Sequence, residues 1–499
     1  MNRTNIQMHL RRFSASSIVE AAMRLLWAEY PNKLDALQTA PWHILLLVKW
    51  SLQDKHIHLR VGRRIQSEEF DVCRQMVRDL VGQEYLASKP PIWLMLRAHM
   101  PQFDFQRPEG WGFLRWPALI AREPAEHRSR RQFIEQIGLS PEHFMDLTYG
   151  IMAAVTLCKL PIKPNWYEPV RHYYGASVDH YIRLIALDLP ALRDQLQSDA
   201  KQQKLPLRQE LYEFPYLKRY PFFKARNGFL YAWHPMVAAR GLEEIVHLRL
   251  SRLGEQYTRP FSRLFERYVW ELAQSMSSKT ITEEEFENRA GQQASKVEAI
   301  IPLHGANVLI EAKMALFADD VLLTDNANQA HHKTKRVRDG IKQAWNVSKA
   351  LRADNSLFPQ CARAQHDYLL LVTSRELGLG SGDKLRRLFA PGMLDYPDDD
   401  CRKWLPLENV FIMGILDYER LSVAVASNSV PLLDLLKEAV EKNRNPATSA
   451  ILFDSFLAPY VKNWGSTDLL RQAHRDSRRR LGESFGQTPE ELQADGEDI

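Results

Sequence analysis

The sequence has little of what disulfide-stabilised, zinc-binding or exported proteins need. Its four cysteines are far apart and form no C-x-x-C pair: Cys73, Cys158, Cys361 and Cys401. This spacing argues against a secreted disulfide scaffold and against a structural zinc site. The first residues contain no apolar segment typical of an export signal, and no apolar run is long enough to span a bilayer. We therefore expect a cytoplasmic protein that does not cross a membrane.

The signature motifs of several enzyme classes are also missing. The chain contains no nucleophile elbow, no H-E-x-x-H zinc motif and no dinucleotide-binding fingerprint. The glycine-rich residues 378–384 lack the G-x-x-x-x-G-K-[ST] spacing of a phosphate-binding loop, so they are expected to form an ordinary loop. The net charge of +5 over 499 residues permits a nucleic-acid partner without requiring one. Hydrolases and redox enzymes of these familiar types are thus not indicated.

Hydrophobic patterning predicts a helical first part of the chain. Apolar residues recur at helical spacing over much of residues 1–200, and Ser67, Ser140 and Ser177 stand where N-caps are expected. Residues 201–250 contain an Asn-Gly pair between short apolar runs, which predicts a β-hairpin followed by a helix. We interpret residues 1–200 as a helical N-terminal domain and residues 201–250 as its connection to the rest of the chain.

The second part of the chain has the pattern of an α/β layer. Two continuous apolar runs, residues 367–373 and 409–416, are typical of central strands covered on both faces. A helical piece lies between them, and strand–helix–strand order predicts a layered domain over residues 251–440. Residues 441–499 are expected to form a C-terminal helix followed by an acidic, disordered tail.

Residues 295–317 are the most informative stretch of the sequence. They read as two apolar strands joined by a turn at residues 304–305. Glu311 and Lys313 are two residues apart on the second strand, so their side chains leave the same face of the sheet. A hairpin centred on this turn pairs Glu298 with Glu311 across the two strands.

Two carboxylates facing each other need a physical reason, because like charges directly opposite on neighbouring strands are destabilising. A hard divalent cation such as Mg²⁺ supplies one, since it binds carboxylate oxygens and keeps several waters. Water held by a metal is a ready nucleophile, and the metal neutralises charge that develops on a phosphate. Lys313 can orient or deprotonate that water. The alternative is a structural Glu–Lys pair at a sheet edge.

This arrangement resembles the PD-(D/E)xK nuclease superfamily, which has the restriction-endonuclease-like fold. Glu311-Ala312-Lys313 matches the E-x-K tripeptide, and Glu298 matches the upstream acidic residue, which is usually Asp in that family. The resemblance implies an α/β protein in which a mostly helical N-terminal region precedes a mixed-sheet domain flanked by helices. It also implies a Mg²⁺ ion, replaceable by Mn²⁺, held by Glu298, Glu311 and the backbone carbonyl of Ala312.

The resemblance extends to two neighbouring helices. Glu266, on the helix before the hairpin, matches a carboxylate that some members direct towards the metal; an ion pair with a neighbouring arginine is the alternative. Gln343, on a helix predicted for residues 334–351, matches a glutamine that lies near the catalytic lysine. One face of that helix is basic and can follow a phosphate backbone, or can simply be solvated. Its residues are Lys335, Arg338, Lys342 and Lys349.

Two acidic stretches flank the hairpin. Thr282 and Glu285 have the spacing of a capping box, which predicts that residues 283–285 form a solvated helix start. The other stretch is expected to be a surface loop, with a metal-ligand role as the alternative. It contains Asp319, Asp320 and Asp325.

The resemblance, which covers residues 251–440, implies a metal-dependent endonuclease that hydrolyses phosphodiester bonds, and DNA is favoured because most of the superfamily acts on it. Similarity to stand-alone bacterial defence nucleases implies an antiviral role against phage or invading DNA. The helical region would then sense a phage protein or clamp DNA, alone or as part of a homo-oligomer. Two alternatives stay open: an inactive nuclease-like protein that binds nucleic acid or acts as a scaffold, and a DNA-repair or transposition nuclease.

Overall fold

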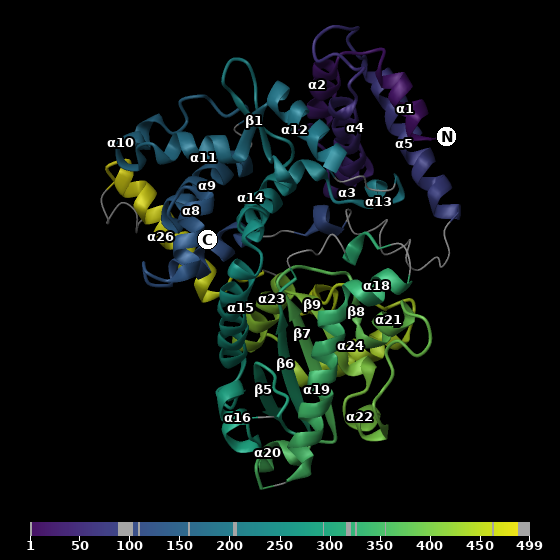
Figure 1. Ribbon diagram of the computed structural model, residues 1–499, viewed down its shortest axis with the longest axis vertical. Helices are drawn as coiled ribbons and strands as arrows, with labels where there is room; N and C mark the ends of the chain where they lie inside the picture. The colour runs from purple at the N-terminus through teal and green to yellow at the C-terminus, as the bar shows by residue number, and fades with distance from the viewer. Residues whose placement is uncertain are drawn as a thin grey trace. The chain divides into compact units, whose positions relative to one another are not determined.

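The computed structural model describes residues 2–87, 103–107, 110–157, 160–202, 207–292, 294–315, 321–324, 327–354, 356–461 and 464–487. In this part of the chain it is an α/β protein with many helices and two mixed sheets (Figure 1), so the predicted class is confirmed. The chain forms two compact units. The first contains Met1–Arg252 and Leu469–Ile499, and the second contains Leu253–Asp468.

The first unit is a set of helices around an apolar core. Helix α4 (Pro41–Gln53) buries almost every residue, including the fully buried Trp50, and packs against α2 (Ala15–Leu26) and α12 (Leu189–Gln202). Helix α9 (Pro141–Thr156) has the predicted N-cap, Ser140. Helices α5 (Ser67–Ala87) and α11 (Ser177–Ile185) instead contain Ser67 and Ser177 as their first residues, and the N-cap of α11 is Ala176. Helix α14 (Pro235–Leu250) packs against several of the others. The remaining helices are α1 (Arg3–Leu10), α3 (Lys33–Gln38), α7 (Arg115–Ala121), α8 (Arg128–Ile137), α10 (Arg171–Tyr174), α13 (Leu207–Tyr212) and α26 (Asp468–Ser484).

The Asn-Gly hairpin is present, but it does not connect two domains. Strands β2 (Phe222–Lys224) and β3 (Leu230–Ala232) pair antiparallel, and β1 (Ala186–Asp188) pairs parallel with β2. Trp233 and Val237, just after the hairpin, are fully buried in the same core as α4. Residues 201–250 therefore belong to the first unit, because their apolar side chains complete its core.

The C-terminal part of the chain is divided differently from the prediction. Residues 441–468 belong to the second unit, where Asp454 forms a 3.0 Å ion pair with Arg420. Most of α26 belongs to the first unit, where Arg480 makes two hydrogen bonds of 2.7 and 2.8 Å to the buried Asp146. The boundary expected at residue 440 thus falls at residue 468. The acidic tail beyond residue 487 lies outside the described residues.

The second unit is organised around a six-stranded sheet of order β4-β5-β6-β7-β9-β8. Strand β6 pairs antiparallel with β5 and parallel with β7, and β7 pairs parallel with β9. Both apolar runs predicted as central strands are confirmed as β7 and β9, and nearly all their residues are buried. The strands are β4 (Ile281–Thr282), β5 (Ala299–Leu303), β6 (Ala306–Lys313), β7 (His366–Thr373), β8 (Gly380–Ser381) and β9 (Val410–Gly414).

The hairpin between β5 and β6 has the predicted register. Ala299 pairs with Ile310, and the two strands are joined through His304 and Gly305. Gly305 has a φ of 82°, a left-handed conformation that glycine adopts without strain. Glu298 directly precedes β5, so it lies just beyond the pair of Ala299 and Ile310, at the end of the hairpin where Glu311 follows Ile310.

Helices cover this sheet. Helix α15 (Glu255–Met276) packs against β6 and α23 (Ile415–Ala426), while α19 (Lys335–Ala353) packs against β6 and β7. Helix α15 contains Pro260 within its first two turns. No helix in the described part of the chain is both long and apolar enough to cross a membrane. The other helices are α16 (Glu283–Ala290), α18 (Ala327–Lys333), α20 (Pro359–Ala362), α21 (Gly382–Arg387), α22 (Asp399–Trp404), α24 (Leu432–Arg444) and α25 (Asp454–Leu457).

A buried ion pair fixes α19 on the sheet. Asp367 of β7 has no exposed surface, and Arg352 of α19 binds both of its carboxylate oxygens at 2.6 and 2.9 Å. Asn307 of β6 donates a further hydrogen bond of 2.8 Å, and Ser348 donates another. Since every charge of the pair is satisfied, the cluster locks β6, β7 and α19 into one arrangement.

Replacing Arg352 with Met is expected to lower the free energy of unfolding by about 3–5 kcal/mol, because Asp367 then stays buried without a cation. Chemical denaturation of the full-length protein measures this. The matched control is Arg444→Met, which removes an arginine from exposed pairs with Glu408 and Glu441. This control should cost less than about 1 kcal/mol. Equal losses in the two variants would contradict the structural role of the buried pair.

Candidate active site

Two carboxylates and one ammonium group meet at the ends of β5 and β6 that lie away from the turn. Glu311 is only 2% exposed, and Lys313 forms an ion pair with it. Glu298 directly precedes β5 and is half-buried. Its Oε1 accepts a hydrogen bond of 3.3 Å from the backbone N–H of Ala312. The side chains of the E-x-K tripeptide and the upstream glutamate therefore lie together, as the hairpin register predicts.

Both carboxyl groups hold protons more tightly than a carboxyl group in water does. Burial raises the pKa of Glu298 to about 9, and the nearby charges of Glu311 and Glu266 act in the same direction. Burial also raises the pKa of Glu311 to about 7, although Lys313 opposes this shift. A single ammonium group therefore does not balance the two carboxylates, and an additional cation would stabilise their charged forms.

Glu266 and Glu283 lie within electrostatic range of this pair. Both raise the pKa of Glu298 and of Glu311. Glu266 lies on α15, and its own pKa is raised, mainly by burial. Glu283 lies at the start of α16 and forms a 3.0 Å ion pair with Lys296. The structure thus adds negative charge around the hairpin from two more elements.

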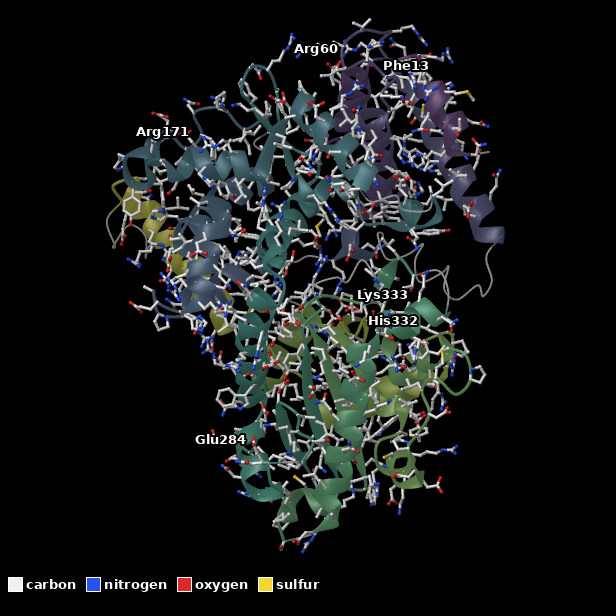
Figure 2. The ribbon with its side chains drawn as sticks, in the orientation of Figure 1. Phe13, Arg60, Arg171, Glu284, His332 and Lys333 are labelled. Atoms are coloured by element: carbon white, nitrogen blue, oxygen red, sulfur yellow. The ribbon has the colours of Figure 1, made fainter. Side chains whose placement is uncertain are left out.

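Residues 283–285 form the predicted helix start, with Glu284 and Glu285 exposed and Glu283 partly exposed. The capping box of Thr282 and Glu285 is present, and Glu284 points outward (Figure 2). The Glu283 side chain is 44% exposed and pairs with Lys296, and from there its charge acts on Glu298 and Glu311. Phe286, three residues further on, is buried.

Among the described residues, no three His, Cys, Asp or Glu side chains are close enough to form a ready metal-binding group. Glu266 therefore does not complete a ligand set with Glu298 and Glu311 in this structure. Asp319, Asp320 and Asp325 lie outside the described residues. The two converging carboxylates fit a hard divalent cation that takes its other ligands from backbone carbonyl oxygen and water.

A glycine brings α19 unusually close to the site. A Cβ atom on Gly340 would lie 3.2 Å from Glu311 Cγ, 3.2 Å from Lys313 Cε and 3.0 Å from Leu371 Cδ1. Only glycine therefore permits this packing without a shift of the neighbouring side chains. The sequence analysis missed Gly340, since its importance depends on contacts between elements far apart in the chain.

The basic residues of α19 are in different environments. Lys342 is exposed, Lys335 forms an ion pair of 2.7 Å with Asp339, and Lys349 forms one of 2.5 Å with Asp398. Arg338 is 9% exposed and donates hydrogen bonds of 3.0 and 3.2 Å to the carbonyl of His331. Arg338 is thus committed to joining α18 and α19, which corrects its assignment to an open phosphate-binding face. Gln343 is half-buried on α19, three residues after Gly340.

The raised pKa values predict how the stability of the metal-free protein depends on pH. Glu298 and Glu311 have pKa values of about 9 and 7 in the folded protein, against 4.5 ordinarily. As pH rises from 4.5 to about 9, the unfolded chain releases protons that the folded chain retains, so the free energy of unfolding falls. In EDTA, Tm should fall more steeply over this range in the wild type than in a Glu298→Gln/Glu311→Gln variant. Parallel curves would contradict the assignment.

Searches against protein-family models, curated proteins and solved structures found no match to this chain.

Proposed function

We propose that this protein is a metal-dependent nuclease that hydrolyses phosphodiester bonds of DNA. The observation that supports the proposal best is the meeting of Glu298, Glu311 and Lys313 at one place on the sheet. One buried and one half-buried carboxylate beside a single ammonium group destabilise the metal-free folded chain. Perturbed pKa values of this kind are concentrated at functional sites. The resemblance of the E-x-K tripeptide to the PD-(D/E)xK superfamily supports the same reaction class.

In this proposal the side chains have distinct tasks. Glu298 and Glu311, with the carbonyl oxygen of Ala312, hold Mg²⁺ or Mn²⁺. The bound ion supplies a Lewis acid that neutralises charge on the phosphate and acidifies water. Lys313 positions the attacking water and stabilises negative charge on the phosphate through its ammonium group. Glu266, on α15, assists metal binding, because its carboxylate adds to the negative potential at the site. Gln343, on α19, assists the reaction.

We also propose that the second unit has the restriction-endonuclease-like fold. Support comes from the order of its elements: an antiparallel hairpin β5–β6 that carries the carboxylates, a helix α19, and then β7 and β9 parallel to β6. The exposed Lys335 and Lys342 and the partly exposed Lys349 lie on α19 and can contact phosphates near the site.

Incubation of the purified full-length protein with supercoiled plasmid tests the reaction class. We expect nicking or linearisation in Mg²⁺ or Mn²⁺ and none when EDTA is added. Single-stranded DNA and RNA, assayed in parallel, define the substrate. If all these substrates stay intact in both metals, the proposal of a nuclease fails and an inactive nucleic-acid-binding or scaffold protein becomes the better account.

The biological role that fits this activity is a bacterial defence effector acting on phage or invading DNA. This role predicts that expression is toxic or that it reduces phage plaques, and that both effects disappear in a Glu311→Ala variant. Harmless expression with unchanged plaque numbers would count against it. Recovery of a stable repair or transposition complex by affinity purification would favour the nuclease of a larger assembly instead.

A further inference from the structure

A second charged feature lies in the first unit, in the loop between α4 and α5. Residues 55–64, which we call the basic loop, read Lys-His-Ile-His-Leu-Arg-Val-Gly-Arg-Arg. Four of these ten residues are lysine or arginine, two are histidine, and none is acidic. The proposed catalytic chemistry uses none of them. Positive charges this close together repel one another and destabilise the folded surface. A function for the loop would explain why they are present.

The main chain of the basic loop is held firmly in place. The backbone N–H groups of residues 14–16, at the start of α2, donate hydrogen bonds of 2.9 to 3.1 Å to three loop carbonyls, those of His58, Leu59 and Arg63. Arg193 donates a hydrogen bond of 2.6 Å to the carbonyl of Ile57. Ile57 and Ile65 are buried and anchor the two ends of the loop. The basic side chains are therefore presented by a fixed backbone.

Close packing at one end of the loop orders two of the guanidinium groups. Arg12 and Arg63 lie over the ring of Phe13, at 5.6 and 4.9 Å from its centroid. Gly62 permits the loop to approach, because a Cβ atom there would lie 3.0 Å from the backbone nitrogen of Ser14. These cation–π contacts hold both guanidinium groups against the ring, and Arg63 also forms an ion pair with Glu69.

The positive charge of the basic loop is only partly compensated. Arg63 and Arg64 form partly exposed ion pairs with Glu69 and Glu20. Lys55 and Arg60 are exposed and form no ion pair with any residue that the structure describes. Arg60 lies at the outer edge of the unit (Figure 2).

We infer that the basic loop binds the phosphate backbone of nucleic acid. Exposed lysine and arginine side chains on a fixed main chain, such as Lys55 and Arg60, give affinity that does not depend on the nucleotide sequence. Val61, 72% exposed, is the one large apolar side chain exposed in the loop. One valine supplies too little apolar area to insert into a membrane, so the positive charge is the main feature that the loop offers a partner. This gives the first unit a nucleic-acid-binding function of its own.

Fluorescence anisotropy with a labelled DNA duplex tests the inference on the full-length protein. EDTA in the buffer prevents cleavage, so the measurement does not depend on the proposed nuclease activity. For the Lys55→Ala/Arg60→Ala variant we expect Kd to rise about tenfold, and the slope of log Kd against log salt to fall by about 2, as loss of two phosphate contacts requires. The control is Lys224→Ala/Arg226→Ala, which removes the same charge from exposed positions at the β2–β3 turn. Its Kd should stay within about twofold of the wild type.

Unchanged Kd and salt slope in the basic-loop variant would overturn the inference. It would also be overturned if the variant lost binding to phosphatidylserine vesicles while binding DNA as the wild type does, since the loop would then contact a membrane surface. If the wild type cleaves DNA and the basic-loop variant binds DNA as the wild type does, only the inference about the loop is wrong. If the protein does not cleave DNA but the variant loses binding as expected, only the proposed reaction is wrong.

Discussion

The Glu311→Gln variant is expected to lose metal-dependent DNA cleavage by about 10³-fold or more while remaining folded. The substitution keeps the shape of the side chain but removes a carboxylate that the proposed reaction uses to hold the metal. Because Glu311 is 2% exposed and its pKa is raised, its negative charge destabilises the metal-free protein. The variant should therefore be at least as stable as the wild type in EDTA at pH 8. Initial rates of plasmid nicking and thermal unfolding measure the two quantities.

A second readout connects this loss of cleavage to the metal. Mg²⁺ or Mn²⁺ should raise the Tm of the wild type, because an ion that binds only the folded chain stabilises it. This increase should disappear in Glu311→Gln. The matched control, Glu408→Gln, removes a carboxylate paired with Arg444 at the surface of the same unit and should change neither readout. Cleavage by Glu311→Gln within tenfold of the wild-type rate would contradict the role of Glu311.

Replacing Lys313 with Met should lower the cleavage rate by about 10²–10³-fold while the metal-induced rise in Tm is kept. The ammonium group is assigned to the attacking water and the phosphate, whereas Glu298 and Glu311 remain to hold the ion. In the Lys313→Met variant the two carboxylates no longer have a neighbouring ammonium group, so their affinity for a divalent ion should not fall. Loss of cleavage with retained metal binding distinguishes Lys313 from Glu311.

Two comparisons keep the Lys313 result interpretable. Lys403→Met removes an exposed lysine from α22 of the same unit, and its cleavage rate should stay within about threefold of the wild type. Lys313→Arg keeps the positive charge but enlarges the group and should recover only part of the rate. If Lys313→Met cleaves normally, or if it loses the metal-induced rise in Tm as Glu311→Gln does, the proposed division of tasks is wrong.

The sequence by itself determined the features that depend on short-range rules. The alternation of side chains along a strand and a two-residue turn at Gly305 were enough to predict the register of β5 and β6, and with it that Glu298 lies near Glu311. Ser140 and the capping box at Thr282 predicted the starts of two helices, and unbroken apolar runs predicted β7 and β9 as central strands. These features follow from neighbours a few residues apart, which a linear sequence shows directly.

Only the tertiary structure decided the features that depend on what packs against each element. It brought Glu283 within electrostatic range of Glu298 and Glu311, bonded Arg338 to the carbonyl of His331, and packed α19 against the site at Gly340. It also assigned α26 to the first unit through the bond between Arg480 and the buried Asp146. Each of these contacts joins segments that are far apart in the sequence, and it forms because of how whole helices and strands pack. The periodicity of a helix or a strand shows which of its faces is buried, but not which other segment packs against that face.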